Sequence, residues 1–244
     1  MDIETRPIEA YAWSIWNQNI GIGQIKDPGA LLCFAAKFHG SSRMQFFSEW
    51  EHGRKRMAQE LYRLFDEADA ITGWNSDKFD IRWINAQFLE FGLGKPSPYA
   101  KVDLLRSVKR QVMLPSYKLE YVARWLGLGG KVQTGGFDLW RGVMDGDDLS
   151  RRRMKRYNIH DVRLTEQVFD RLNEKGWVLG LPNASIAGGL CCSNPMCGSE
   201  RLEQRGFQTT KTRRYKRYKC KDCSSWTQAV HSEKGSAELK PVAA

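Results

Sequence analysis

The sequence predicts a mixed α/β fold, in which helices flank a sheet, followed by a small metal-binding module. Short apolar runs of strand length come early in the chain, and segments with helical periodicity are interspersed among them and dominate later. Six cysteines are present, and four of them form two short-spaced pairs near the C-terminus. A chain of 244 residues can bury one sizeable core and also carry a small appendix.

The first half of the chain contains the strand-like runs. Residues 30–38 form an apolar run typical of a buried strand, and residues 43–47 are predicted to pair with it across a Gly-Ser-Ser turn. Residues 70–74 are predicted to form another buried strand that leads into a loop. Apolar residues at helical spacing predict helices over residues 54–68 and 81–91.

The second half is expected to be mainly helical. A short apolar segment at 102–105 is followed by a predicted helix around 119–126 and by a glycine-rich connection over 127–136. Residues 149–173 are predicted to form a long amphipathic helix, with Asp148 or Ser150 as its cap. Near the N-terminus, Trp13 and Trp16 could stack on a terminal base, but core packing is the favoured interpretation.

Composition and charge indicate a cytoplasmic globular protein. No apolar run approaches the roughly 20 residues of a membrane span, and the N-terminus lacks the pattern of a secretion signal, so no membrane association is expected. The formal net charge is +10, and residues 201–221 alone contribute +8 through nine Lys and Arg against one Glu. The basicity therefore belongs to the C-terminal part, where a polyanionic partner is expected.

Five side chains arrive in an order that points to a site for two metal ions. Asp2 and Glu4 are two residues apart in a predicted strand, so both can face the same way. Asp80 ends the sequence Asn-Ser-Asp-Lys-Phe-Asp, and Tyr157 and Asp161 lie one turn apart on the long helix. Carboxylate clusters suit Mg²⁺ or Mn²⁺, and two such ions about 3.5–4 Å apart can clamp a phosphodiester.

In this order the motifs resemble the DEDD superfamily of 3′–5′ exonucleases, tyrosine subtype, which have a ribonuclease H-like fold. The resemblance covers roughly residues 1–175 and is greatest to stand-alone phage and bacterial relatives of the proofreading domains of family B polymerases. It implies that Asp2 bridges both metals, that Glu4 and Asp161 complete the shell of one ion, and that Asp80 holds the other. Tyr157 would orient the attacking water. The histidine subtype has a histidine where this chain has Arg156.

The N-terminus departs from this pattern. Family members carry an apolar strand ahead of the Asp-Ile-Glu-Thr motif, whereas only Met1 precedes Asp2 here. We therefore expect either a shortened strand or a start at another position. The terminal ammonium would then lie close to the metal ligands.

The cysteine pairs predict a zinc ribbon with one structural Zn²⁺. Cys192 and Cys197 are separated from Cys220 and Cys223 by 22 residues, a pattern that suits tetrahedral zinc. Cys191 could replace Cys192 as a ligand. A disulfide is the alternative, and it is less consistent with a cytosolic chain. Accordingly, we expect an exonuclease domain at 1–178, a linker at 179–190, the ribbon at 191–230 and a disordered tail at 231–244.

Basic and aromatic residues alternate between the two cysteine pairs. Phosphates would contact the cations and bases would stack on the rings. Asn75 and Lys131 are further predicted contacts; the glycines before Lys131 do not have Walker spacing. Most of the basic residues in 151–156 are expected to be solvated, with one or two reaching DNA. The predicted nucleic-acid contacts of the ribbon are Lys211, Arg213, Arg214, Tyr215, Lys216, Arg217 and Tyr218.

The expected activity is two-metal hydrolysis of phosphodiester bonds from single-stranded or frayed 3′ DNA ends. Because the chain has no room for a polymerase domain, any proofreading would be in trans, for a polymerase or beside a recombination protein. Three alternatives stay open: an RNA exonuclease, a structure-specific endonuclease on the same fold, and a catalytically silent protein that binds nucleic acid.

Overall fold

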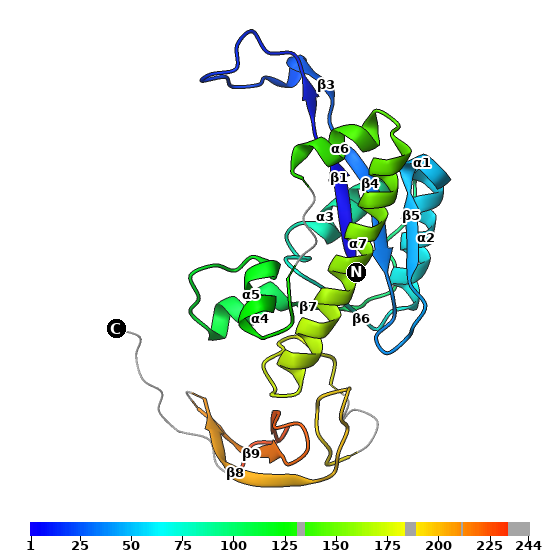
Figure 1. Cartoon of the computed structure of the whole chain (residues 1–244). Coiled ribbons are helices and arrows are strands. Elements are labelled where there is room, and N and C mark those ends of the chain that lie inside the picture. Colours follow the sequence, from blue (N-terminus) through cyan, green and yellow to red (C-terminus); the bar gives the residue numbers. More distant parts are fainter. Residues whose placement is uncertain (131–134, 184–188, 211, 234–244) are drawn as a thin grey trace.

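The computed structural model describes residues 1–130, 135–183, 189–210 and 212–233, and it has the mixed α/β architecture predicted from the sequence. The main sheet is antiparallel, with the order β1-β4-β5. A parallel pair, β6-β7, is joined to β1 by a 2.9 Å hydrogen bond that the Met1 ammonium donates to the Thr72 carbonyl. These strands form the central layer (Figure 1). Their bounds are β1 (Asp2–Arg6), β4 (Ala30–Ala36), β5 (Gln45–Ser48), β6 (Ala70–Gly73) and β7 (Ala100–Asp103).

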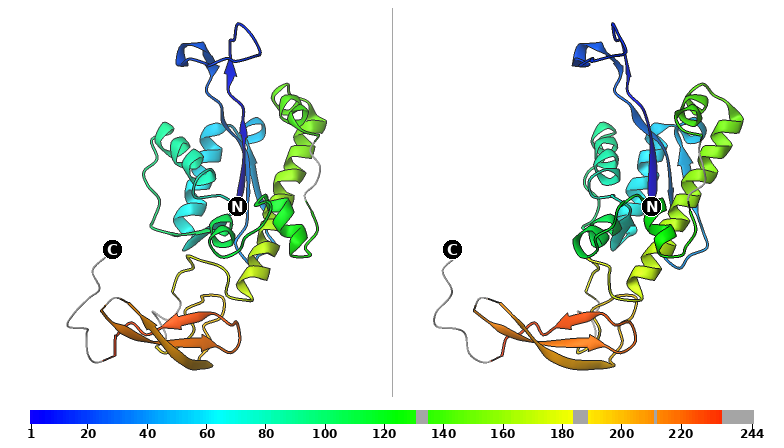
Figure 2. Two further views of the ribbon diagram at one scale, coloured as in Figure 1. Left: turned by 90° about the vertical axis from the view of Figure 1, so that its left-hand side faces the viewer. Right: turned by 60° about the vertical axis from the view of Figure 1, so that its left-hand side comes forward.

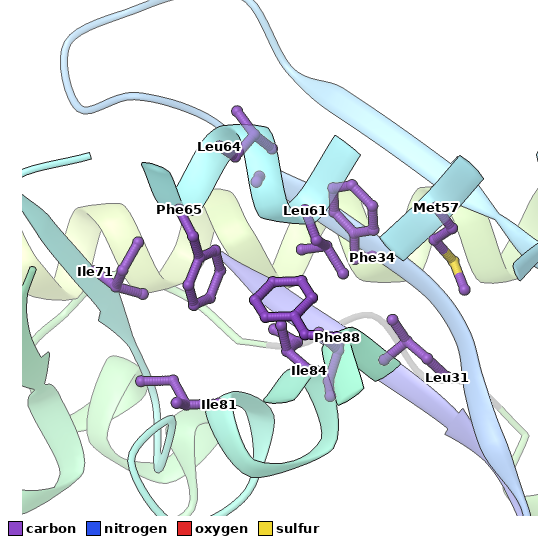
Figure 3. Close-up of a cluster of buried hydrophobic side chains, with 12 residues drawn as sticks. Leu31, Phe34, Met57, Leu61, Leu64, Phe65, Ile71, Ile81, Ile84 and Phe88 are labelled. Atoms are coloured by element: carbon purple, nitrogen blue, oxygen red, sulfur yellow. The ribbon is translucent and has the colours of Figure 1, made fainter. Parts of the chain in front are cut away.

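One face of the main sheet packs on α2 (Arg54–Glu67) and α3 (Asp80–Glu90). Ile3 of β1 lies opposite Phe34 of β4, and both are buried in this core. The helices contribute apolar side chains at helical spacing, so each buries one stripe of its surface. Figure 3 shows the resulting cluster, which includes Met57, Leu61, Leu64, Phe65, Ile81, Ile84 and Phe88.

The other face packs on α6 (Phe137–Met144) and on the first half of α7 (Asp148–Asn173). Glu4 pairs with Cys33 and Thr5 pairs with Leu31, so Leu32 is an extra residue in β4. Such a bulge changes the direction of the strand. Both Leu32 and Cys33 belong to the cluster on this face, where they meet α6 and α7.

The second half of α7 forms a separate core with α4 (Leu104–Gln111) and α5 (Leu119–Trp125). The long helix was predicted from the sequence, but its cap is Asp147, not Asp148 or Ser150. The Asp147 carboxylate accepts hydrogen bonds from the backbone N–H groups of Leu149 and Ser150. The helix itself already starts at Asp148, so the capping side chain must come one residue earlier.

Several short elements were not predicted. They are α4, α6, α1 (Glu49–His52), the 3₁₀ helix η1 (Ile22–Gln24) and the strands β2 (Glu9–Ala10) and β3 (Ile25–Asp27). The last two strands pair with each other and project from the body of the protein (Figures 1 and 2). No helix in the described ranges is long and apolar enough to cross a bilayer.

An apolar cavity of about 140 Å³ lies beside Met1. It is bounded by the C-terminal end of β4 and by β6, with side chains from α2 and α7 completing the walls. Ala36, Phe38, Leu64, Ile71 and Phe169 contribute to its lining.

The C-terminal part forms a second, antiparallel sheet with the order β10-β9-β8. It contacts the end of α7, where the Asn194 side-chain amide donates a 2.9 Å hydrogen bond to Oδ1 of Asn173. Gly176 has φ +72°, and a Cβ added there would lie 3.1 Å from the Cα of Ser225. Glycine at this position therefore permits the close approach. The three strands are β8 (Leu202–Thr209), β9 (Arg214–Cys220) and β10 (Trp226–Gln228).

Candidate functional site

Strand β1 directs Asp2 and Glu4 toward the face of the sheet that α7 covers. Cys33 lies opposite Glu4 in the sheet register and is buried against Met154 of α7. Burial raises the pKa of the Cys33 thiol well above its ordinary value, and the nearby charges of Glu4 and Asp2 raise it further. Both carboxylates are therefore close to Cys33, as the two-residue spacing in a strand requires.

Asp80 lies at the start of α3 and reaches β1. Its Oδ1 accepts a 3.3 Å hydrogen bond from the backbone N–H of Ile3. Burial raises the pKa of Asp80 to about 6, although the Met1 ammonium and the Ile3 N–H both favour the ionised form. Burial also lowers the pKa of the Met1 ammonium, and the charges of Asp2 and Asp80 counteract part of this effect. Asp2 and Asp80 are thus both close to the start of β1.

Helix α7, which carries the remaining candidates, contacts the start of β1. The side-chain amide of Asn158 donates a 2.7 Å hydrogen bond to Oδ2 of Asp2. Asp161 follows one turn later on the same face and is only 1% exposed. Tyr157 is half-buried, and its ring packs edge-on against Trp140 of α6 at 6.2 Å between centroids.

Asp103, to which the sequence pattern alone assigned no role, holds the loop that precedes Asp80. Its carboxylate accepts hydrogen bonds from the backbone N–H groups of Asn75 at 3.1 Å and Asp77 at 3.3 Å. It also caps α4 through the N–H of Arg106. An aspartate at the junction of a strand and a helix is a recognisable capping signal, but its second task in the loop requires the fold. Asn158 likewise had no signal beyond its place beside Tyr157.

This donor set fits divalent metal ions. Asp80 and Asp161 are buried carboxylates. Asp80 is bonded to β1, the strand that carries Asp2, and Asp2 is bonded to α7, the helix that carries Asp161. Gathering buried negative charge is costly unless cations compensate it. Carboxylate oxygens are ligands that Mg²⁺ and Mn²⁺ prefer. Asp2, Glu4, Asp80 and Asp161 are therefore the side chains that would hold such ions.

Four cysteines form a second candidate metal centre. The Sγ atoms of Cys192, Cys197, Cys220 and Cys223 all lie within 4.8 Å of one another. The Cys192–Cys223 and Cys197–Cys220 sulfur distances are 3.5 and 3.7 Å. A tetrahedron with Zn–S bonds of about 2.3 Å requires sulfur atoms roughly 3.8 Å apart, whereas a disulfide needs about 2.05 Å. The group therefore fits zinc, and it contains Cys192 and not the alternative ligand Cys191.

The thiols in this group have unequal acidity. Burial raises the pKa of Cys192. Burial also tends to raise the pKa of Cys223, but hydrogen bonds from the hydroxyl and N–H of Ser225, together with those involving Cys192 and Cys197, lower it to about 7. At least one thiolate is therefore accessible near neutral pH for metal binding.

The predicted nucleic-acid contacts of the ribbon lie mainly on β9 and just before it. Arg213 and Arg214 are exposed, and four further predicted contacts, Tyr215, Lys216, Arg217 and Tyr218, are half-buried. The guanidinium groups of Arg214 and Arg217 lie 4.3 and 4.6 Å from the ring centroids of Phe207 and Trp226. Lys131 and Lys211 lie outside the described residues, and Trp226 is an aromatic neighbour that was not singled out from the sequence.

Comparison with known proteins supports the architecture. A model of the RNase H superfamily matches residues 1–173, which is most of the chain and includes all five side chains of the first site. The search of curated proteins gave no match. Proteins of this superfamily are generally nucleases that use divalent metal ions. The chain therefore belongs to the RNase H superfamily and carries, after its RNase H-like domain, a cysteine cluster that could bind zinc.

Proposed function

We propose that the protein is a metal-dependent 3′–5′ exonuclease that acts on single-stranded or frayed DNA ends. The observation that carries the proposal is the convergence of Asp2, Asp80 and the Asp161-bearing face of α7 at the start of β1. The polarity of cleavage and the preference for ends rest on the resemblance of the motifs to tyrosine-type DEDD exonucleases.

In this proposal each side chain has a separate task. Asp2, Glu4, Asp80 and Asp161 hold two Mg²⁺ or Mn²⁺ ions, which when bound activate water and stabilise the charge that develops on the phosphate. Tyr157 donates from its phenol to the attacking water and so orients it. The packing of its ring against Trp140 restricts where that hydroxyl can point. The phenol is a poor base near neutral pH, which suits positioning and not proton abstraction.

The ribbon is proposed to hold the nucleic acid. Its cations lie beside aromatic rings on β9 and β10, so that phosphates and bases can be contacted together. One Zn²⁺ bound by the four cysteines would supply the folding energy that so small a sheet lacks. Any proofreading partner, such as a polymerase or a recombination protein, would act in trans.

The test is cleavage of 5′-labelled DNA and RNA oligonucleotides with Mg²⁺ or Mn²⁺. We expect a ladder that shortens from the 3′ end of DNA. Products from a single internal cut would instead indicate an endonuclease, and a ladder on RNA alone an RNA exonuclease. A gel shift without cleavage would indicate a silent binding protein.

Substitutions in the carboxylate site test whether it carries the activity. Asp161→Asn should abolish cleavage and leave DNA binding intact, because the charge of a ligand is lost while the side chain keeps its size. Asp170→Asn is the matched control, since it changes the same residue type on the same helix at an exposed position paired with His39. Tyr157→Phe should slow cleavage without changing metal dependence. Equal activity of Asp161→Asn and Asp170→Asn would refute the proposal.

A further inference from the structure

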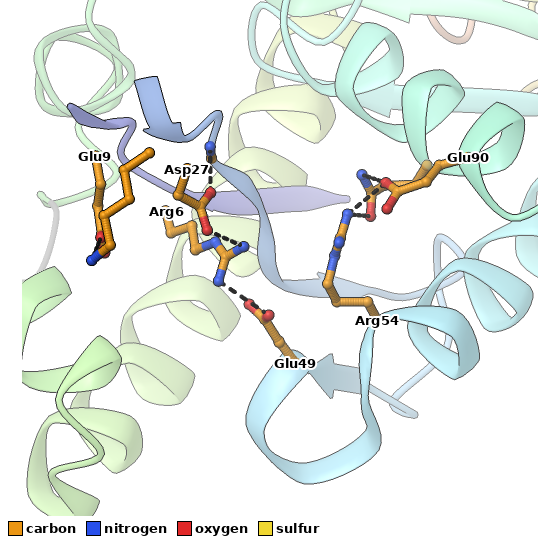
Figure 4. A network of polar contacts seen from close by, with 9 residues as sticks. Arg6, Glu9, Asp27, Glu49, Arg54 and Glu90 are labelled. Atoms are coloured by element: carbon orange, nitrogen blue, oxygen red, sulfur yellow. Dashed lines mark hydrogen bonds and ion pairs between the residues drawn. The ribbon is translucent and has the colours of Figure 1, made fainter. Parts of the chain in front are cut away.

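Residues 8–27, which we call the arm, extend beyond the end of β1 and away from the body of the protein (Figures 1 and 2). The base is fixed by Arg6, whose guanidinium lies 2.9 Å from Asp27 and 3.4 Å from Glu49 (Figure 4). Further out, Tyr11 and Gln24 are joined by two hydrogen bonds of 2.9 Å. The arm therefore has a defined backbone, although it contains no buried side chain.

Large apolar side chains of the arm are in contact with solvent. Trp13 is 96% exposed and Trp16 is 76% exposed, so the prediction that they pack in the core is wrong. Nothing in their local sequence distinguishes a tryptophan that enters the core from one on a projecting hairpin. Tyr11, Ile15 and Ile22 are also mostly exposed. An apolar surface of this extent on a nuclease domain indicates a binding surface.

The arm is also electrically neutral along its outer part. Residues 10–25 contain no charged side chain in a protein whose net charge is +10. Polar amides are present at its tip, where Asn17, Gln18 and Asn19 are exposed beside Trp16. Exposed rings next to amide groups can stack on bases and hydrogen-bond to their edges, without contacting phosphates.

The arm lies close to the path that we propose for the substrate. It is a direct continuation of β1, the strand that carries Asp2 and Glu4. The start of α7, with Arg152, Arg153 and Arg156 exposed, lies at the same end of the domain (Figures 1 and 2). A single strand that runs along this end can therefore place phosphates near α7 and bases on the arm.

We propose that the arm binds single-stranded nucleic acid by stacking bases on Trp13 and Trp16, as a second contact beyond the ribbon. This inference rests on the proposed function, because it takes the nucleic-acid substrate from there. It has a distinctive physical consequence. Stacking on a neutral arm releases no counterions, so the arm should raise affinity without changing how steeply affinity falls with salt.

The experiment measures binding of labelled oligo-dT to the full-length protein in buffer without Mg²⁺ or Mn²⁺ and without chelator, so that the ribbon keeps its zinc, by fluorescence anisotropy at several salt concentrations. For the double variant Trp13→Ala/Trp16→Ala we expect affinity for a long oligonucleotide to fall at least about fivefold for each stacking interaction removed. The salt slope should stay that of the wild type. Trp13→Phe/Trp16→Phe keeps the rings and should retain most of the affinity. In contrast, Arg213→Gln/Arg214→Gln in the ribbon should reduce the salt slope.

Ile15→Ala is the control within the arm, because Ile15 is 87% exposed but offers no ring. An equal loss of affinity in Ile15→Ala and Trp13→Ala/Trp16→Ala would overturn the stacking proposal, and so would unchanged affinity in the double tryptophan variant. Sedimentation velocity provides a further check. Concentration-dependent association that the tryptophan variants abolish would show that the arm docks on protein and would likewise overturn it.

Failure of this inference can be distinguished from failure of the proposed function. Binding measured without Mg²⁺ or Mn²⁺ does not require hydrolysis, so the arm can be confirmed even if the labelled-oligonucleotide assay shows no cleavage. Conversely, the tryptophan variants could bind as the wild type does while the protein still gives a 3′–5′ ladder. That result would support the exonuclease proposal and contradict the proposal that the arm binds the substrate. Circular dichroism of each variant establishes that the domain remains folded, as expected for changes outside its core.

Discussion

Asn158 illustrates how one buried side chain can prepare a metal site. It has no exposed surface, and its amide fixes one oxygen of Asp2 at 2.7 Å. A carboxylate oxygen held in this way cannot rotate freely, so the second oxygen keeps a defined direction. Asn158 is thus expected to act on chemistry through Asp2, as a positioning residue.

The corresponding prediction is that Asn158→Ala weakens metal binding and destabilises the protein. Loss of a buried hydrogen bond to a charged group costs about 1.5–3 kcal/mol. We expect a lower melting temperature without added Mg²⁺ or Mn²⁺ and a higher Mg²⁺ concentration for half-maximal cleavage, with a smaller change in the rate at saturating metal. The control is Asn173→Ala at the far end of the same helix, which should leave the metal requirement unchanged. If Asn158→Ala lowers the melting temperature but leaves the Mg²⁺ requirement unchanged, the role of Asn158 is structural only.

Residue identity and spacing made part of this site predictable. Asp2 and Glu4 had to share a face of a strand, and Tyr157 and Asp161 had to share a face of a helix, because those periodicities are fixed by backbone geometry. Asn158 and Asp103 could not be found in the same way. Their roles depend on which elements lie across from them, and one sequence contains no direct information on that arrangement.

At the scale of elements, the start of α7 depends on Asp147. The hydroxyl and backbone N–H of Ser150 hold the pKa of Asp147 below its ordinary value, and its carboxylate caps the helix that carries Tyr157 and Asp161. A lowered pKa means that the ionised form stabilises the folded state. This contribution is present above the unfolded pKa of about 3.9 and is lost as the pH falls through the folded value.

We therefore expect Asp147→Ala to lower the melting temperature at pH 6, with the difference from wild type shrinking as the pH falls below about 4. Calorimetry over this pH range, without added Mg²⁺ or Mn²⁺, would measure the two melting temperatures. Asp148→Ala, one residue later, is the control and should have a smaller effect, since the exposed Asp148 carboxylate lies 3.9 Å from Arg151 and is not the cap of the helix. A difference between wild type and Asp147→Ala that does not change with pH would contradict the assigned cap.

The N-terminal edge of β1 offers a prediction about strand length. The Met1 ammonium is buried, and an apolar cavity lies between the end of β4 and β6 next to it. An extension of a few apolar, β-branched residues ahead of Met1 would continue β1 into this cavity and replace the ammonium with an amide. Full burial of one Val or Ile stabilises by about 1.5–3 kcal/mol.

The measurement is the melting temperature of extended proteins. A Val-rich extension should raise it, whereas an extension of equal length made of Ser and Asp should not, because charged groups are unfavourable in an apolar cavity. If both extensions give the melting temperature of the starting protein, the cavity does not accept a strand.

Long periodic elements were also the ones that could be predicted. The apolar runs that became β4 and β6 stand out by their composition, and the helices α2, α3 and α7 contain enough residues to display a period. Among the short helices, α5 was predicted, whereas α4 and α6, with eight residues each, were not, because two turns display the helical period only weakly. Strands β2 and β3 are shorter still. The arm that they form buries no side chain, so burial imposes on it no alternation of apolar and polar residues from which these strands could be predicted.

At the scale of the whole molecule, the proposed catalysis and the proposed binding of nucleic acid belong to different parts of the chain. The side chains of the first site all lie within residues 1–161, whereas the four cysteines lie within 192–223. Nine of the basic residues are in 201–221. The RNase H-like domain has its own apolar cores, whereas the ribbon is expected to depend on zinc, so loss of the ribbon should leave the domain folded.

The last prediction is that Cys220→Ser releases zinc and unfolds the ribbon but not the RNase H-like domain. Affinity for long single strands should fall, and the salt slope should decrease by about 0.7 for each phosphate that the ribbon no longer neutralises. Hydrolysis of a thymidine monophosphate nitrophenyl ester should continue, because it does not require the ribbon. Metal analysis measures the loss of zinc, anisotropy titrations measure the affinity and its salt slope, and the nitrophenyl ester measures the remaining hydrolysis. Cys191→Ser is the matched control, because Cys191 precedes the cluster but does not belong to it, and it should retain zinc. Loss of small-substrate hydrolysis in Cys220→Ser but not in Cys191→Ser would place the ribbon within the catalytic architecture.

The junction between α7 and the ribbon gives the two parts a shared boundary. Asn173 is bonded to Asn194, and Gly176 lies directly against Ser225. If the four cysteines hold zinc, we expect their oxidation to unfold the ribbon, break this junction and open the final turn of α7 to solvent. Amide hydrogens of residues 173–177 should then exchange with deuterium as fast as those of a fraying helix end, while amides near Asp161 stay protected. On the proposed function, peroxide would therefore release long single strands while the RNase H-like domain stays folded.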